Sequence, residues 1–259
     1  MEQDPEALGD ILGKIDKPQG KPSKPVSTSP FVEEPECKVC GDRGWVISVD
    51  PAFMDKAYPY RCECQHESDE LARKERLFKN CHLPSSAIDC RFETFDVRPG
   101  IEEAFAKAKL LAEGSGELQW LTLMGLCDVG KSHLAMAVAQ AWLAMGRKVR
   151  YAAVPELLDD LRNAYNPDSE ISYETEFEII KAADLLVLDD LGMESPTPWA
   201  QEKLDLIVEL RSRENKALMV TTNQPLTKIS QRIASRLQRF VPGAIIPIVA
   251  EEYVQYRSS

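Results

Sequence analysis

A stretch of eight residues near the middle of the chain has the composition of a phosphate-binding loop. It begins at Gly125 and reads GLCDVGKS, which matches the pattern G-x-x-x-x-G-K-[ST]. In such a loop, backbone N–H groups surround the β-phosphate of a nucleotide, and the start of the next helix adds partial positive charge. We expect Lys131 to contact the β- and γ-phosphates and the Ser132 hydroxyl to ligate Mg²⁺. The predicted nucleotide-binding residues are Gly125, Leu126, Cys127, Asp128, Val129, Gly130, Lys131, Ser132 and His133.

The residues on either side of this loop support its assignment. The apolar run at residues 121–124 is typical of a buried strand, and residues 133–140 are good helix formers. Strand, loop and helix in this order distinguish a nucleotide site from an accidental glycine-rich turn. Asp128 stands where many such loops have a third glycine, and its carboxylate should repel phosphates unless it turns away. We therefore expect nucleotide binding that is weakened by Asp128.

A second acidic motif follows an apolar run at residues 184–192, which read DLLVLDDLG. A buried strand that ends in two carboxylates is what a phosphate-binding loop needs beside it. We expect Asp189 to hold Mg²⁺ through water and Asp190 to polarise the attacking water as a general base. An acidic turn without function is the alternative, and the GKS motif upstream disfavours it.

Two further segments could complete the site. Residues 217–223 (ALMVTTN) read as a strand whose last residue, Asn223, would lie beside Asp189 and contact both the γ-phosphate and the attacking water. Taken alone, Asn223 is equally well explained as a turn residue. Arg232 and Arg236 are four apart on one helical face, so either could reach into the site of a neighbouring copy. Solvated surface arginines are the alternative.

The cysteines indicate a metal site. Four of the seven are clustered, at Cys37, Cys40, Cys62 and Cys64. The first pair is C-x-x-C followed by glycine, as in a zinc knuckle, and residues 45–60 between the pairs suit a short hairpin. His66 could replace one of the last two thiolates. A redox-active C-x-x-C pair is the alternative, but the sequence around it lacks the βαβ pattern of thioredoxin-like proteins. We expect structural Zn²⁺, because so small a segment needs the metal to fold.

Strand and helix patterns alternate from about residue 91 onward, which predicts an α/β fold with a parallel sheet flanked by helices. Domain boundaries follow from composition. Residues 1–36 are rich in Pro, Lys, Ser and Glu and read as a disordered arm, although a short amphipathic helix within residues 5–15 is equally compatible. The remaining expected parts are a zinc-binding module (37–66), a helical linker (67–90) and the main domain (91–259).

Composition limits the classes of function. The chain has 259 residues, 44% hydrophobic and 28% charged, as in soluble globular proteins, and we expect it in the cytoplasm because it shows no membrane span or signal peptide. We expect no membrane association, because no apolar run approaches the ~20 residues of a span and the acidic start is unlike a signal peptide. A net charge of −11 is the wrong sign for a broad duplex-DNA surface and fits protein partners better.

Taken together, GLCDVGKSHLA, VPELLDDLR, LLVLDDLG, the VTTN strand and the RIASRL segment resemble the DnaC/DnaI family of replicative helicase loaders within the AAA+ ATPases. The resemblance covers about residues 37–257, and IstB-type transposition helpers are close relatives. It implies ATP binding with slow, regulatory hydrolysis, and a main domain that lacks a C-terminal lid. By position it gives catalytic roles to Lys131, Asp189, Asp190, Asn223 and Arg236, the last as a finger in trans with Arg232 as second candidate. Asp128 and a shortened, cysteine-bearing loop are the departures.

The partners that this resemblance implies are a replicative DNA helicase, single-stranded DNA and further copies of the ATPase domain. A transposition helper or another nucleotide-dependent adaptor on DNA is the alternative, but such helpers generally lack the cysteine module. A small-molecule kinase is disfavoured, because no lid or acceptor-site arginines are present in the sequence.

Overall fold

The computed structural model describes residues 37–41, 43–50, 56–166, 172–251 and 253. The expected disordered arm, residues 1–36, lies outside this part of the chain. Contacts divide the molecule after Cys62 into two compact units.

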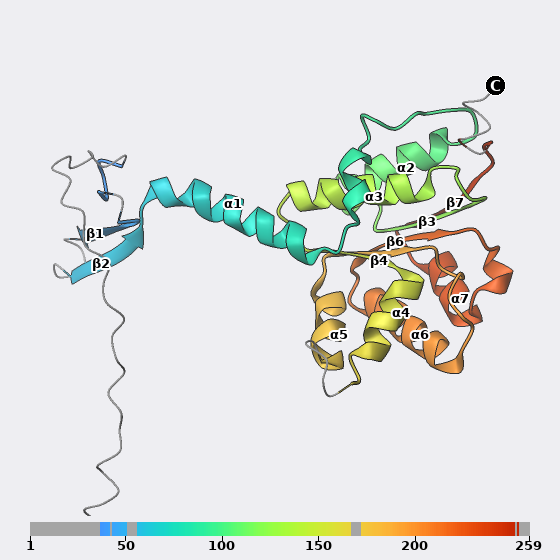
Figure 1. Cartoon of the computed structure of the whole chain (residues 1–259). Coiled ribbons are helices and arrows are strands. Elements are labelled where there is room, and N and C mark those ends of the chain that lie inside the picture. The colour runs from blue at the N-terminus through green and yellow to red at the C-terminus, as the bar shows by residue number, and fades with distance from the viewer. Residues whose placement is uncertain (1–36, 42, 51–55, 167–171, 252, 254–259) are drawn as a thin grey trace, which may run out of the picture. The chain divides into compact units, whose positions relative to one another are not determined.

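The first unit contains a two-stranded antiparallel sheet (Figure 1). Strands β1 (Trp45–Asp50) and β2 (Lys56–Arg61) pair with Trp45 opposite Arg61, which confirms the hairpin expected between the two cysteine pairs. A tight turn precedes β1, in which the Gly41 N–H donates to the Cys37 carbonyl at 2.8 Å. Gly41 has a φ of +58°, a conformation that glycine adopts without strain.

The second unit begins with helix α1 (Glu63–Asn80) and a short 3₁₀ turn (Ser85–Asp89). The helix starts four residues before the expected position, because the segment after Cys62 continues directly into helical backbone. Its C-terminal part packs on the main domain through Leu77, and the Arg73 guanidinium donates to the Gly146 carbonyl at 3.2 Å.

Five parallel strands form the sheet of the second unit, in the order β4-β5-β6-β3-β7. Parallel strands place their carboxyl ends at one edge, so the loops that follow them converge there. The strands are β3 (Trp120–Gly125), β4 (Val149–Ala153), β5 (Leu185–Asp189), β6 (Ala217–Thr222) and β7 (Gly243–Ile248).

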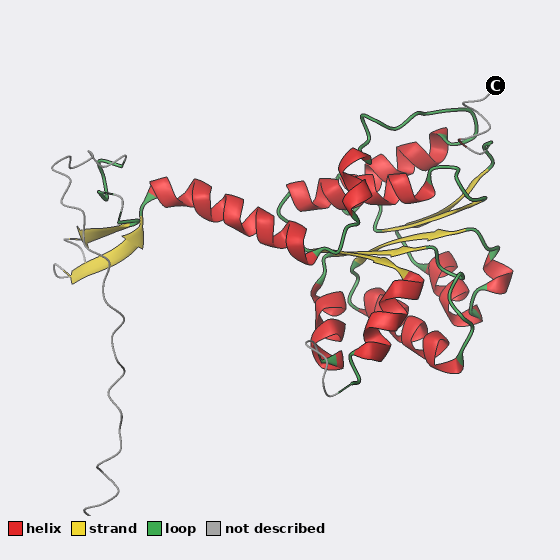
Figure 2. Ribbon diagram, in the orientation of Figure 1, coloured by secondary structure: helices red, strands yellow, loops and turns green. Residues whose placement is uncertain are grey.

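Helices cover both faces of this sheet (Figure 2), as the buried, uninterrupted strands require. Helices α2 (Glu102–Ala112) and α3 (Lys131–Ala144) pack on one face. The other face carries α4 (Val154–Asn163), α5 (Tyr173–Ala182), α6 (Pro198–Arg213) and α7 (Gln231–Arg239). The predicted α/β architecture is confirmed, with element ends shifted by one or two residues. In the described residues, no helix combines the length and the apolar character needed to span a membrane.

Local caps explain where two of these helices begin. The Thr197 side chain accepts the Ala200 N–H at 3.2 Å, and Pro198 at the first helical position fixes the entry into α6. Ser172 caps α5 in the same way by accepting the Thr175 N–H at 3.3 Å. Helix α5 therefore begins at Tyr173.

Candidate functional site

The GLCDVGKS loop connects β3 to α3, in the strand–loop–helix order that the pattern requires. Gly130 immediately precedes the helix with a φ of +98°. A Cβ atom at Gly130 would lie 2.9 Å from the Phe95 ring, so both the backbone conformation and the packing demand glycine. The turn leaves the first N–H groups of α3 directed toward the loop, where they can bind an anion.

Asp128 occupies a left-handed backbone conformation, with a φ of +57°. Glycine adopts this left-handed conformation without steric cost and aspartate tolerates it, which explains why glycine is common at this position in such loops. The Asp128 carbonyl is held from two sides, since it accepts the Tyr253 N–H at 2.9 Å and an Arg98 N–H at 3.3 Å. These bonds fix the backbone of the loop while the residue remains exposed.

Lys131 is the first residue of α3 and only 5% exposed. Its ammonium group donates to the Leu126 carbonyl and therefore lies along the inside of the loop. Burial lowers the pKa of Lys131, and the charges of Asp190, Cys127 and Asp189 oppose this shift. A buried cation along the inside of a glycine-bounded loop, at the start of a helix, suits a polyphosphate.

Asp189 ends β5, and it too is only 5% exposed. Its carboxylate accepts hydrogen bonds from three hydroxyl groups: Ser132 at 3.0 Å, Tyr151 at 2.5 Å, and Thr221. Ser132 and Asp189 are thus adjacent oxygen donors of the kind that Mg²⁺ prefers, so the residues fit that ion.

Asp190 follows at the tip of β5 with a φ of +58°. Its N–H donates to the Thr221 hydroxyl at 2.9 Å, which anchors this left-handed residue to β6. Burial and the neighbouring Asp189 charge raise the pKa of Asp190, and Lys131 opposes them. A carboxylate with a raised pKa, next to a carboxylate that fits Mg²⁺ such as Asp189, is suited to accept a proton from water.

Asn223 follows β6, which lies between β3 and β5 in the sheet. Its Nδ2 lies 3.5 Å from the Cys127 sulfur, on the phosphate-binding loop. The Asn223 Oδ1 atom is buried, with no hydrogen-bond partner among the described residues. The sheet order therefore brings Asn223 to the loop, together with Lys131, Ser132, Asp189 and Asp190.

The two candidate finger arginines are not part of this cluster. Both lie on α7, where Arg236 forms an ion pair with Glu209, and Arg232 lies 4.0 Å from Asp205. Both acids belong to α6. Arg232 has a side chain 81% exposed, whereas that of Arg236 is 31% exposed.

Two residues of the site carried no recognisable signal in the sequence. Tyr151 lies within β4, whose sequence VRYAA has no polar residue at its carboxyl end, and Thr221 belongs to the VTTN strand without a role of its own. Both contact Asp189 only because β4 and β6 flank β5. The register of the sheet was needed to identify them.

A recess of about 190 Å³ lies beside the loop. The Phe95 and His133 rings meet edge to face there, with centroids 5.0 Å apart. Aromatic walls next to a phosphate-binding loop could hold a nucleobase. The lining residues include Phe95, Arg98, Asp128, Gly130, His133 and Tyr253.

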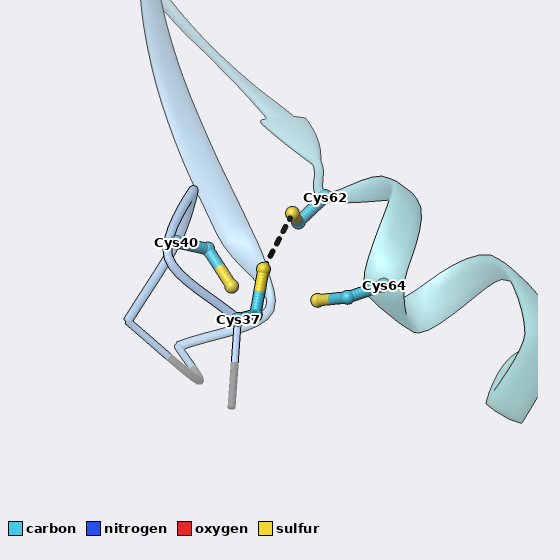
Figure 3. A group of neighbouring side chains, drawn as sticks. All are labelled: Cys37, Cys40, Cys62 and Cys64. Atoms are coloured by element: carbon cyan, nitrogen blue, oxygen red, sulfur yellow. Dashed lines mark hydrogen bonds between the residues drawn. The ribbon is translucent and has the colours of Figure 1, made fainter. Parts of the chain in front are cut away.

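The four clustered cysteines meet at the start of α1 (Figure 3). Their sulfur atoms lie within 4.8 Å of one another, and those of Cys37 and Cys62 are 3.7 Å apart. Four thiolates around a tetrahedral Zn²⁺ with Zn–S bonds of about 2.3 Å would be about 3.8 Å apart, so the set fits zinc. His66 is in α1, but its side chain lies outside the described part of the structure.

Comparison with known proteins agrees with this geometry. The family described as "IstB-like ATP binding protein" matches residues 70–237. The "Replicative helicase loader DnaC" of Escherichia coli strain K12 is 23% identical over 188 residues, which cover 72% of this chain and 76% of that protein.

Solved structures show the same fold. A DnaC helicase loader structure aligns with a TM-score of 0.56 and 19% identity over 64% of this chain and 99% of that one. A replication initiator DnaA bound to AMPPCP and single-stranded DNA aligns with a TM-score of 0.57 and 21% identity, over 66% of this chain but only 52% of that one. The five-stranded parallel sheet with helices on both faces thus has an AAA+ like fold, and the chain belongs to the family of IstB-like ATP binding proteins.

Proposed function

We propose that this protein is an ATP-dependent loader of the replicative DNA helicase, which binds the helicase and single-stranded DNA and uses ATP binding and hydrolysis as its switch. The single observation that carries the proposal is the cluster at one sheet edge, where Lys131, Ser132, Asp189, Asp190 and Asn223 come together. The similarity to DnaC along most of both chains supports the choice of partner. A cytoplasmic location goes with this role.

The chain's own residues divide the work on ATP. Lys131 and the loop N–H groups bind the β- and γ-phosphates, and Ser132 with Asp189 would hold Mg²⁺, which neutralises phosphate charge when bound. Asp190 accepts a proton from the attacking water, because its raised pKa makes it a better base than an ordinary aspartate. Asn223 orients the γ-phosphate or the water through the amide that faces Cys127. Lys131 must leave the Leu126 carbonyl to reach phosphate.

We propose that ATPase domains associate side by side, so that an arginine of α7 reaches the γ-phosphate held by the next copy. Arg236 is the first candidate, and its release from Glu209 would then accompany association. Arg232 is the second, and its exposed side chain needs to break only a long contact with Asp205.

The N-terminal arm and the cysteine module are proposed to dock on the helicase. Zn²⁺ held by Cys37, Cys40, Cys62 and Cys64 would give that module a fixed structure, because four thiolates in one cluster replace a hydrophobic core.

Single-stranded DNA requires a local surface on so acidic a protein. Aromatic rings with nearby cations gather where α4, α5 and α6 meet. Tyr165 stacks on Tyr173 at 4.5 Å, and the Arg162 guanidinium lies over the Trp199 ring at 5.0 Å. Stacking on such rings tolerates any base sequence. We propose this group as the contact for single-stranded DNA.

The test is co-purification with the replicative helicase of the same cell, with and without ATP. Wild-type protein should retain the helicase in a nucleotide-dependent way, whereas Lys131→Ala should lose ATP binding and the nucleotide dependence. Removal of residues 1–66 should abolish helicase capture while ATP binding persists. Helicase capture that survives this truncation would contradict the docking assignment.

A transposition helper is the second candidate, because the matching family is named for IstB. The four-cysteine cluster favours the loader, since such helpers generally lack it. Capture of a transposase in place of the replicative helicase would decide for the helper.

A further inference from the structure

Asp189 is a buried carboxylate whose two oxygens are held by different groups. Oδ1 accepts the hydroxyls of Ser132 and Thr221, whereas the donor to Oδ2 is Tyr151, at 2.5 Å. The proposed function moves Ser132 from Asp189 to Mg²⁺. Thr221 and Tyr151 then remain as the groups that orient the carboxylate, one on each oxygen.

Tyr151 reaches Asp189 because of the strand register. In the β4–β5 pair, Tyr151 lies opposite Val187 and Ala153 lies opposite Asp189. Side chains two residues apart in a strand lie on the same face of a sheet, so Tyr151 and Ala153 share a face, as do Val187 and Asp189. Tyr151 and Val187 belong to the core cluster that includes α3, so Tyr151 and Asp189 both project toward α3. The Tyr151 ring is only 4% exposed within the core cluster on that face, which restricts the directions in which its hydroxyl can point.

The hydroxyl of Tyr151 is a permanent donor. Burial, followed by the charge of Asp189 and the hydrogen bond to it, raises the pKa of Tyr151 far above the working range of an enzyme. The backbone of Tyr151 is also anchored, because its N–H donates to the Cys81 carbonyl at 2.8 Å. Cys81 follows directly after α1, so this segment covers the otherwise open edge of β4.

We propose that Tyr151 is a positioning residue for the Mg²⁺ site: its hydroxyl fixes the second oxygen of Asp189, so that the carboxylate keeps one orientation when Ser132 turns to the metal. This proposal rests on the proposed ATP site. Without the hydroxyl, Oδ2 is left buried with no described donor, and the carboxylate can rotate away from its metal-binding position. The loss falls on Mg²⁺-dependent steps, whereas phosphate contacts by the loop are retained.

Tyr151→Phe tests this role, because it removes the hydroxyl and keeps the buried ring. Binding of a fluorescent ATP analogue is measured in EDTA and over a Mg²⁺ titration, and the fold is checked by thermal unfolding. We expect the half-saturating Mg²⁺ concentration to rise about tenfold, equivalent to about 1.4 kcal/mol, with affinity in EDTA within about twofold of wild type. Tyr60→Phe is the matched control, since it removes an exposed hydroxyl in the first unit, and it should titrate like wild type.

A double-mutant cycle separates orientation from packing. In an Asp189→Asn background, Tyr151→Phe should no longer change the Mg²⁺ titration, because there is no charged oxygen to position. If Tyr151→Phe alone fails to fold, Asp189→Asn should restore folding by removing the unpaired charge, and a double variant that remains unfolded would overturn the proposal.

An unchanged Mg²⁺ titration in a folded Tyr151→Phe protein, or equal weakening with and without Mg²⁺, would also overturn it. Wild-type protein that binds no nucleotide would instead refute the ATP site on which the proposal depends, so the two failures are distinct.

Discussion

The carboxylate of Asp128 should weaken ATP binding, and two substitutions can separate its charge from its backbone conformation. Asp128→Asn removes the charge and keeps a residue type that tolerates the φ of +57°. Asp128→Gly removes the charge and also relieves the left-handed backbone. Because the Asp128 carbonyl is fixed by Tyr253 and Arg98, neither substitution should displace the loop.

The size of the expected gain in ATP affinity depends on the exposure of Asp128, because water around an exposed side chain screens its charge. At about 8 Å and an effective dielectric constant of about 40, two like unit charges repel by about 1 kcal/mol. Relief of that repulsion corresponds to about fivefold tighter binding. Both variants should show this gain, and Asp128→Gly should in addition raise the free energy of unfolding by up to about 1 kcal/mol, through its relaxed backbone.

Titration of a fluorescent ATP analogue at low salt and at about 1 M salt is the assay. The gain should appear at low salt and largely vanish at about 1 M, where the Debye length is about 3 Å. Glu117→Gln is the matched control, because it removes an exposed charge before β3, at the opposite end of that strand. Asn and Gly variants that both bind within twofold of wild type at low salt would show that the carboxylate points away from the phosphates and does not weaken binding.

Three further predictions concern Asp190, the cysteine cluster and the arginines of α7. Asp190→Asn should bind ATP within about twofold of wild type but hydrolyse it about a hundredfold more slowly. Since only the ionised Asp190 accepts a proton and its pKa is raised, wild-type hydrolysis should fall as pH drops through a pKa above the ordinary aspartate range, and steady-state rates of the variant should lack that acid limb. The purified chain should carry one Zn²⁺, measured by atomic absorption, and Cys62→Ser should lose it; a metal-free wild-type chain would contradict the site. Arg236→Ala should abolish ATPase stimulation by self-association while leaving ATP binding intact; if Arg232→Ala does so instead, Arg232 is the finger.

Local sequence patterns were sufficient to predict the elements and the chemistry of single motifs. The apolar run before Gly125 and the helix formers after Lys131 define β3, the loop and α3 by adjacent residues alone. The Cys37 and Cys62 pairs likewise predict a thiolate site from their short spacing, and the structure places their sulfur atoms 3.7 Å apart. Burial and hydrogen bonding within a short segment produce such features, so the sequence determines them directly.

Tertiary structure decided which distant residues share the site. The sequence does not state that β6 lies between β3 and β5, and it is this order that carries Asn223 to Cys127 and Thr221 to Asp189. The role of Tyr151 depends on the β4–β5 register, because a one-residue shift of β4 would turn the Tyr151 ring to the other face of the sheet. The ion pair of Arg236 was equally invisible in the sequence. Strand order, register and helix packing arise from contacts between residues far apart in the chain, which no local pattern encodes.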